Sequence, residues 1–223
     1  MRDYIKSKRS LDKGSFLTHS AVNIVVKDDL LFELEVADLE DIIDLFPKAV
    51  TKNIDYIIFG DFDFLRKKNY NASYKDGAIY VLNNQEGNAD ILDDIVHEIG
   101  HSVEDNHQDL VYGDGALEME FLKKREILRK EFSKEGIEVP EDVMSNPDYD
   151  QNLDMFFSEK VGYPRMTAIV QGIFYSPYAA TSLREYFANG FEAHYYHRDV
   201  YLQKVSPVLY DKISKLEELH NET

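Results

Sequence analysis

The spacing of apolar residues changes after residue 82, and this change constrains the fold more than any other feature of the sequence. Before it, β-type runs at 21–36, 55–61 and 78–82 predict a strand pair and two further strands, with an amphipathic helix at 39–50. After it, helical spacing recurs in segments 91–103, 117–135, 166–174, 182–197 and 207–219. We therefore expect an α+β fold, with a small, mostly antiparallel sheet packed on one helix and a mainly helical C-terminal half.

The length of the chain favours one domain. A chain of 223 residues is long enough for one good-sized core. We expect a single domain over 1–223, with a polar N-terminal arm at 1–18 and a helical insertion at 106–177. The basic residues of the arm are typical of a solubilising tail.

Charge and hydropathy exclude several classes of partner. The net charge of −17 argues against nucleic-acid binding, which needs a concentrated basic surface. No apolar run reaches the roughly 20 residues that span a bilayer, and the N-terminus lacks the apolar core of a secretory signal. We expect no membrane span and a cytoplasmic or virion-associated protein, or a secreted one if the chain is a processed form.

Residues 97–101 read His-Glu-Ile-Gly-His, which is an H-E-x-x-H motif. On a helix, His97 and His101 lie one turn apart on one face and can bind one metal ion. Glu98 lies about 100° around the helix, where its carboxylate can activate a metal-bound water. The chain has no cysteine, so His, Asp or Glu must supply every side-chain metal ligand. The motif predicts a zinc site with Glu98 as general base.

A catalytic zinc ion usually has three protein ligands, and the sequence offers alternatives for the third. Glu185 lies on a predicted helix together with Asn189, whose side-chain oxygen is placed to accept from the free nitrogen of a zinc-bound histidine. His107 has the metzincin spacing, but Glu104 occupies the position where that pattern has glycine. The remaining candidates are Asp105, Glu192 and His194.

The motif HEIGHSVED, followed later by a Y-x6-E-x-F-A-x-x-F pattern, resembles the peptidase domain of anthrax lethal factor and its relatives, the Pro-Pro endopeptidases. The resemblance implies a zincin-like fold, zinc bound by His97, His101 and Glu185, and assistance from Tyr178. It covers the predicted active-site helix, the strand before it and residues 178–195. The chain differs from the family in having Asn189 where an acid is usual, and in a longer spacing between His101 and Glu185.

The motifs together predict a zinc endopeptidase that hydrolyses peptide bonds in a peptide or protein substrate with metal-activated water. The strand at 78–82 is expected to be the sheet edge that pairs with substrate. Two alternatives remain: a catalytically silent binding module on a zincin fold, such as a toxin subunit or virion component, and a hydrolase of non-peptide amides. His194 and His197 offer a possible second metal site, although a partly exposed helix end rich in aromatic and His residues is the preferred explanation.

Overall fold

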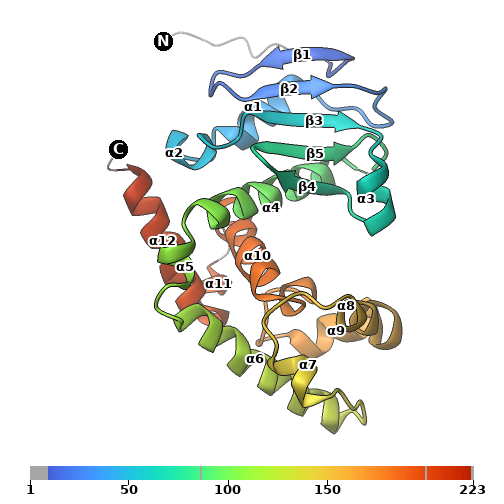
Figure 1. Ribbon diagram of the computed structural model, residues 1–223, viewed down its shortest axis with the longest axis vertical. Coiled ribbons are helices and arrows are strands. Elements are labelled where there is room, and N and C mark those ends of the chain that lie inside the picture. Colours follow the sequence, from blue (N-terminus) through green and yellow to red (C-terminus); the bar gives the residue numbers. More distant parts are fainter. Residues whose placement is uncertain (1–9, 86, 199, 222–223) are drawn as a thin grey trace. The chain divides into compact units, whose positions relative to one another are not determined.

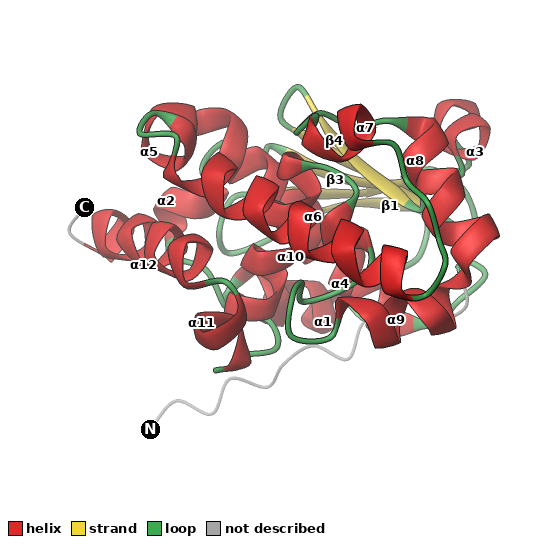
Figure 2. Cartoon of the chain, turned by 90° about the horizontal axis from the view of Figure 1, so that it is seen from below, coloured by secondary structure: helices red, strands yellow, loops and turns green. Residues whose placement is uncertain are grey.

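The computed structural model describes residues 10–85, 87–198 and 200–221 and has an α+β fold (Figure 1). The chain divides into two compact units, which are described separately below. The first comprises residues 1–102 and 219–223, and the second comprises residues 103–218. All strands of the described residues belong to the first unit, while the second is helical (Figure 2). The single-domain expectation stays a prediction.

The first unit contains a five-stranded sheet with the order β1-β2-β3-β5-β4. Its strands are β1 (Gly14–Leu17), β2 (Asn23–Val26), β3 (Tyr56–Gly60), β4 (Ala72–Lys75) and β5 (Ala78–Leu82). The two outer pairs are antiparallel, whereas β2 with β3 and β3 with β5 are parallel. The prediction of a mostly antiparallel sheet is therefore wrong, and the sheet is mixed. The reason is that helical segments carry the chain back between the central strands, as parallel pairing requires.

One face of this sheet is buried. The registers align Ile24 with Ile57 and Ile79, and the next inward row aligns in the same way two residues later. Side chains two residues apart lie on the same face of a strand, so the two rows share one face. The six buried side chains are Ile24, Val26, Ile57, Phe59, Ile79 and Val81.

The strand pair predicted within 21–36 forms only in part. Strand β2 pairs with β1, which lies inside the segment predicted to be a polar arm, and residues 1–9 of that arm lie outside the described residues. Glu35 is the N-cap of α1 (Val36–Ile43) and forms a capping box with Asp38, which ends the extended chain there. Pro47 then starts α2 (Lys48–Thr51), so the helix expected at 39–50 is divided in two.

Helix α4 (Asn88–Asn106) carries the H-E-x-x-H motif, and the helix predicted there is confirmed. Its residues Ile91, Ile95, Ile99 and Val103 are all buried, as their four-residue spacing predicts. The division between the two units falls within this helix, after Ser102. Helix α3 (Asp63–Lys68) completes the helices of the first unit apart from the end of α12.

The second unit is built around α6 (Ala116–Lys134), whose Phe121, Leu128 and Phe132 are fully buried. Helical structure is therefore confirmed across most of 106–177. The other elements are α5 (Gln108–Tyr112), α7 (Glu141–Ser145), α8 (Gln151–Met155), the π-helix η1 (Phe156–Gly162), α9 (Tyr163–Val170), the 3-10 helix η2 (Tyr178–Ala180), α10 (Leu183–Tyr195), α11 (Tyr201–Val205) and α12 (Pro207–Asn221). Within the described part of the chain, none of the helices has the length and apolar character that a membrane crossing requires.

Candidate functional site

His97 and His101 lie one turn apart on α4, with their ring centroids 5.0 Å apart and their planes at 83°. Two imidazoles bound to one tetrahedral ion, at Zn–N distances of about 2.0–2.1 Å, have centroids roughly 5 Å apart. The observed separation therefore fits a shared ion without movement of the backbone. His101 is nearly buried, at 9% exposure, and His97 is half-buried. The pair satisfies the first geometric requirement of the predicted metal site.

Glu98, the predicted general base, is held by the edge of the sheet. Its Oε2 accepts a hydrogen bond from the backbone amide of Tyr74 at 2.5 Å. Tyr74 lies on β4, which pairs with β5 on one side only, so its amide points outward from the sheet. A hydrogen bond to a carboxylate is about twice as strong as one between neutral groups. The contact therefore fixes the direction of the Glu98 carboxylate on α4.

The edge strand differs from the one predicted. Strand β5, residues 78–82, lies between β3 and β4 and is paired on both sides, so it has no free edge. The edge is β4, in a segment whose turn-rich composition concealed it. Asp76 and Gly77 form the two-residue turn of a β4–β5 hairpin, with φ values of 50° and 81°. The Asp-Gly pair is a strong hairpin signal and would have located β4.

In the second unit, Glu185 lies in the first turn of α10. Its backbone amide donates to the side chain of Ser182, the N-cap residue, at 3.1 Å. This cap fixes where the helix begins, and it thereby fixes the position of the half-buried Glu185 in the first turn. Asn189, one turn later, is 7% exposed, and its Oδ1 has no hydrogen-bond partner among the described residues. A buried acceptor of this kind calls for a donor.

Arg184, the residue before Glu185, joins the start of α10 to the last turn of α4. Its Nε lies 3.2 Å from Glu104 and its Nη2 lies 3.2 Å from Asp105. The Glu104 side chain is only 3% exposed and also accepts from the Tyr112 hydroxyl at 2.5 Å. Burial, followed by the charge of Glu104, raises the pKa of Tyr112, so the phenol remains a donor. Sequence reasoning missed this cluster because its members are about 80 residues apart.

The structure favours neither His107 nor Asp105, two of the alternative third ligands. Glu104 is helical and α4 continues to Asn106, whereas the metzincin pattern requires the chain to turn at position 104. His107 lies beyond the helix end, as the N-cap residue of α5. Asp105 is paired with Arg184.

The two histidines of the candidate second metal site do not share one partner. His194 Nε2 lies 3.2 Å from Glu217, while His197 Nε2 lies 3.1 Å from Glu192. Each histidine therefore contacts a different carboxylate, which fits polar side chains near the end of α10. The same contacts occupy Glu192 and His194, the last two candidates for the third zinc ligand.

Tyr178 opens η2, and the segment that carries it is fixed by Arg125. This arginine is fully buried on α6 and donates to the backbone carbonyls of Ala180 and Thr181. It also donates to the carbonyls of Val143 and Asn146, and its guanidinium lies 4.6 Å from the ring centroid of Phe121. Burial lowers the pKa of Arg125 to about 10, which leaves it charged at neutral pH. The path from Tyr178 to the start of α10 is thus pinned to α6.

No family model, curated protein or solved structure matches this chain. A function must therefore be inferred from the side chains themselves.

Proposed function

We propose that the protein is a zinc endopeptidase with a zincin-like catalytic arrangement, in which His97, His101 and Glu185 bind the metal. The observation that carries the proposal is the imidazole pair on α4, at the separation that one ion requires, with Glu98 beside it. Each of the three ligand residues offers one ligand atom of a type that zinc accepts. Three protein ligands leave a fourth position for water or substrate, as in catalytic zinc sites.

The choice of Glu185 as third ligand is supported by the Arg184 ion pairs. Glu104 lies one helical turn beyond His101 on α4, and Arg184 binds Glu104 directly. The residue after Arg184 is Glu185, so these ion pairs fix the turn of α10 that carries the proposed ligand. His107 has no comparable support, because α4 does not turn at position 104.

Asn189 supports the same assignment through its unsatisfied oxygen. A zinc-bound histidine donates its second ring N–H to an acceptor in most sites, and this bond fixes the tautomer of the ring. The buried Oδ1 of Asn189 is an acceptor without a described donor, one turn from Glu185 on α10. We assign it to this role for one of the two histidines.

The proposed chemistry is general-base hydrolysis. Bound zinc lowers the pKa of a water ligand to about 7. Glu98 would act as the general base, accepting a proton from the attacking water and donating it to the leaving amine. The Tyr74 amide keeps the Glu98 carboxylate in one orientation throughout. Tyr178 donates a hydrogen bond from its phenol to the oxyanion that develops on the substrate carbonyl.

The substrate is an extended peptide that pairs with β4. This strand is an edge, and the backbone groups of Ala72 and the carbonyl of Tyr74 face outward beside Glu98, while the Tyr74 amide stays bonded to the Glu98 carboxylate. Backbone pairing to an edge gives affinity for the main chain of a peptide with little dependence on its sequence.

Zinc analysis and a peptide-library assay test the proposal, with Glu98→Gln compared with wild type. We expect stoichiometric zinc in both proteins, and cleavage that falls by a factor of about 10² to 10⁴ in the variant. Glu118→Gln, an exposed carboxylate on α6, is the matched control and should cleave normally. Stoichiometric zinc without hydrolysis that depends on Glu98 would contradict the enzyme and favour a silent binding module.

A further inference from the structure

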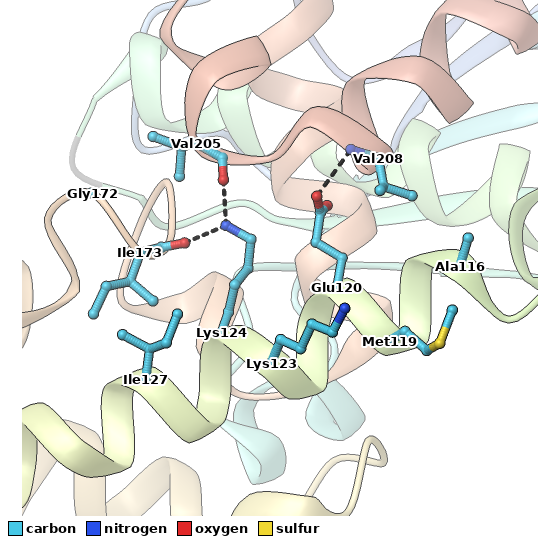
Figure 3. Close-up of a pocket in the computed structure, with 10 residues that line it drawn as sticks. All are labelled: Ala116, Met119, Glu120, Lys123, Lys124, Ile127, Gly172, Ile173, Val205 and Val208. Carbon is cyan, nitrogen blue, oxygen red and sulfur yellow. Dashed lines mark hydrogen bonds between the residues drawn. The ribbon is translucent and has the colours of Figure 1, made fainter.

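A second candidate site lies wholly within the second unit, in a pocket beside α6 with a volume of about 370 Å³ (Figure 3). Its walls come from α6, from the segment after α9, and from the junction of α11 and α12. This volume is at the small end of the range for small-molecule sites. None of its lining residues belongs to the proposed zinc site.

The charged groups of the pocket leave it locally positive. Glu120 is its acidic residue, and its carboxylate accepts from the Tyr186 hydroxyl and from the backbone amides of Val208 and Leu209, at 2.8–3.1 Å. Glu120 thus caps the start of α12, and these three donors offset its negative charge. Lys123 and Lys124 are the two cations in the wall. The two lysines and Glu120 give these lining residues a formal charge of +1, in a chain whose net charge is −17.

Lys124 is the buried part of this positive group. Only 7% of the residue is exposed, and its ammonium donates to the carbonyls of Ile173 and Val205, as the dashed lines in Figure 3 show. The ammonium also lies 5.5 Å and 5.7 Å from the ring centroids of Phe174 and Tyr186, and its third N–H has no carbonyl acceptor among the described residues. Burial lowers the pKa of Lys124 to about 8. The charge of Glu120 offsets part of that desolvation, and a bound anion would offset more of it.

The remaining wall is apolar. Met119 and Ile127 lie on α6 with 57% and 47% of their surfaces exposed, and Val205 and Val208 face them across the pocket (Figure 3). Exposed aliphatic side chains beside a buried cation suit a ligand with a charged head and a short hydrocarbon tail. We propose that this pocket binds a small aliphatic monocarboxylate, with its carboxylate at Lys124 and Lys123 and its chain against Met119 and Ile127.

Titration of the full-length protein with hexanoate, followed by NMR chemical shifts, tests this site. We expect saturable binding, and binding of hexanamide at least about tenfold weaker, because the neutral amide loses the charge-assisted bond. Lys124→Met should abolish hexanoate binding. Ile127→Glu should also abolish it by adding a negative charge at the rim, and the variant should fold because Ile127 is 47% exposed.

The control variant is Lys130→Gln, which removes a lysine of α6 outside the pocket and should bind hexanoate like wild type. If Lys124→Met does not fold, the comparison of Ile127→Glu with Lys130→Gln decides. Equal affinities for hexanoate and hexanamide, absence of saturable binding, or normal binding by Ile127→Glu would overturn the proposal. These outcomes are independent of zinc and of peptide cleavage.

Discussion

The backbone amide of Tyr74 donates to the carboxylate of Glu98, and this bond joins the edge of the sheet to the centre of the H-E-x-x-H motif. The same strand is proposed to pair with substrate. Orientation of the base and recognition of the peptide backbone therefore depend on one short strand.

Tyr74→Pro tests this bond, because proline removes the amide hydrogen. The Tyr74 amide points away from β5, so the substitution breaks no bond of the ladder. We expect kcat to fall roughly tenfold or more, since a hydrogen bond to a charged group is worth about 1.5–3 kcal/mol. Zinc content should be unchanged. Tyr74→Ala keeps the amide and is the control; an equal loss of kcat in both variants would assign the effect to the phenol ring.

Arg184→Gln is expected to weaken zinc binding about tenfold, because it releases the start of α10 from Glu104 and Asp105. Stability should fall by about 1–3 kcal/mol, since the buried Glu104 carboxylate loses its cationic partner. Competition with a chelator measures the zinc affinity. Arg165→Gln, which removes an exposed ion pair to Glu135, is the control. If wild type binds zinc and Arg184→Gln binds it equally well, the proposed role of Arg184 in positioning α10 is wrong, while the zinc site itself is unaffected.

Alanine substitutions at Glu185 and His107 distinguish the two candidate third ligands. We expect Glu185→Ala to lower zinc affinity by at least about tenfold and His107→Ala to leave it intact. Isothermal titration with zinc gives both affinities. The reverse pattern would assign the third ligand to His107 and contradict the arrangement proposed above.

Arg125→Met should destabilise the second unit by at least about 3 kcal/mol, because it leaves buried carbonyls without donors. Arg125→Lys should recover only part of this loss, since one ammonium cannot span all the acceptors. Urea unfolding measures both variants. Arg129→Met, which removes a partly exposed pair with Glu126 on the same helix, should change stability by less than about 1 kcal/mol.

Lys124 predicts a rise in stability with pH. Burial lowers its pKa from 10.5 to about 8, so between these values the unfolded chain binds more protons than the folded one. Stability from this group therefore increases as pH rises, by roughly 2 kcal/mol between about pH 8 and about pH 9.5. Lys124→Met should flatten the rise in urea unfolding. Burial also raises the pKa of Tyr186 and Tyr195, which lowers stability as pH rises through the ordinary tyrosine pKa of about 10.

Local patterns predicted the helices better than the sheet. The four-residue spacing from Ile91 to Val103 is a property of one segment, and α4 forms where it was expected. Strand order and direction depend on contacts between distant segments, so the parallel pairing of β3 with β5 has no local signal. The missing strand β4 did have one, in Asp76 and Gly77.

In the candidate site, too, local features could be predicted and contacts between distant segments could not. The spacing of His97 and His101 alone predicted that the two rings share a face. The partners of Glu98 and Arg184 come from segments 24 and about 80 residues away, and nothing in the sequence near either residue indicates them. Hydrogen bonds to backbone atoms are especially difficult to predict, because any residue type can supply them.

The acceptors of Arg125 are all main-chain oxygens, and every amino acid provides one at the same place. Exposed positions such as Asn146 can thus accumulate substitutions over evolutionary time while the route of the chain past Tyr178 is preserved. The side chains of such a surface loop can change, while its backbone carbonyls continue to bind Arg125.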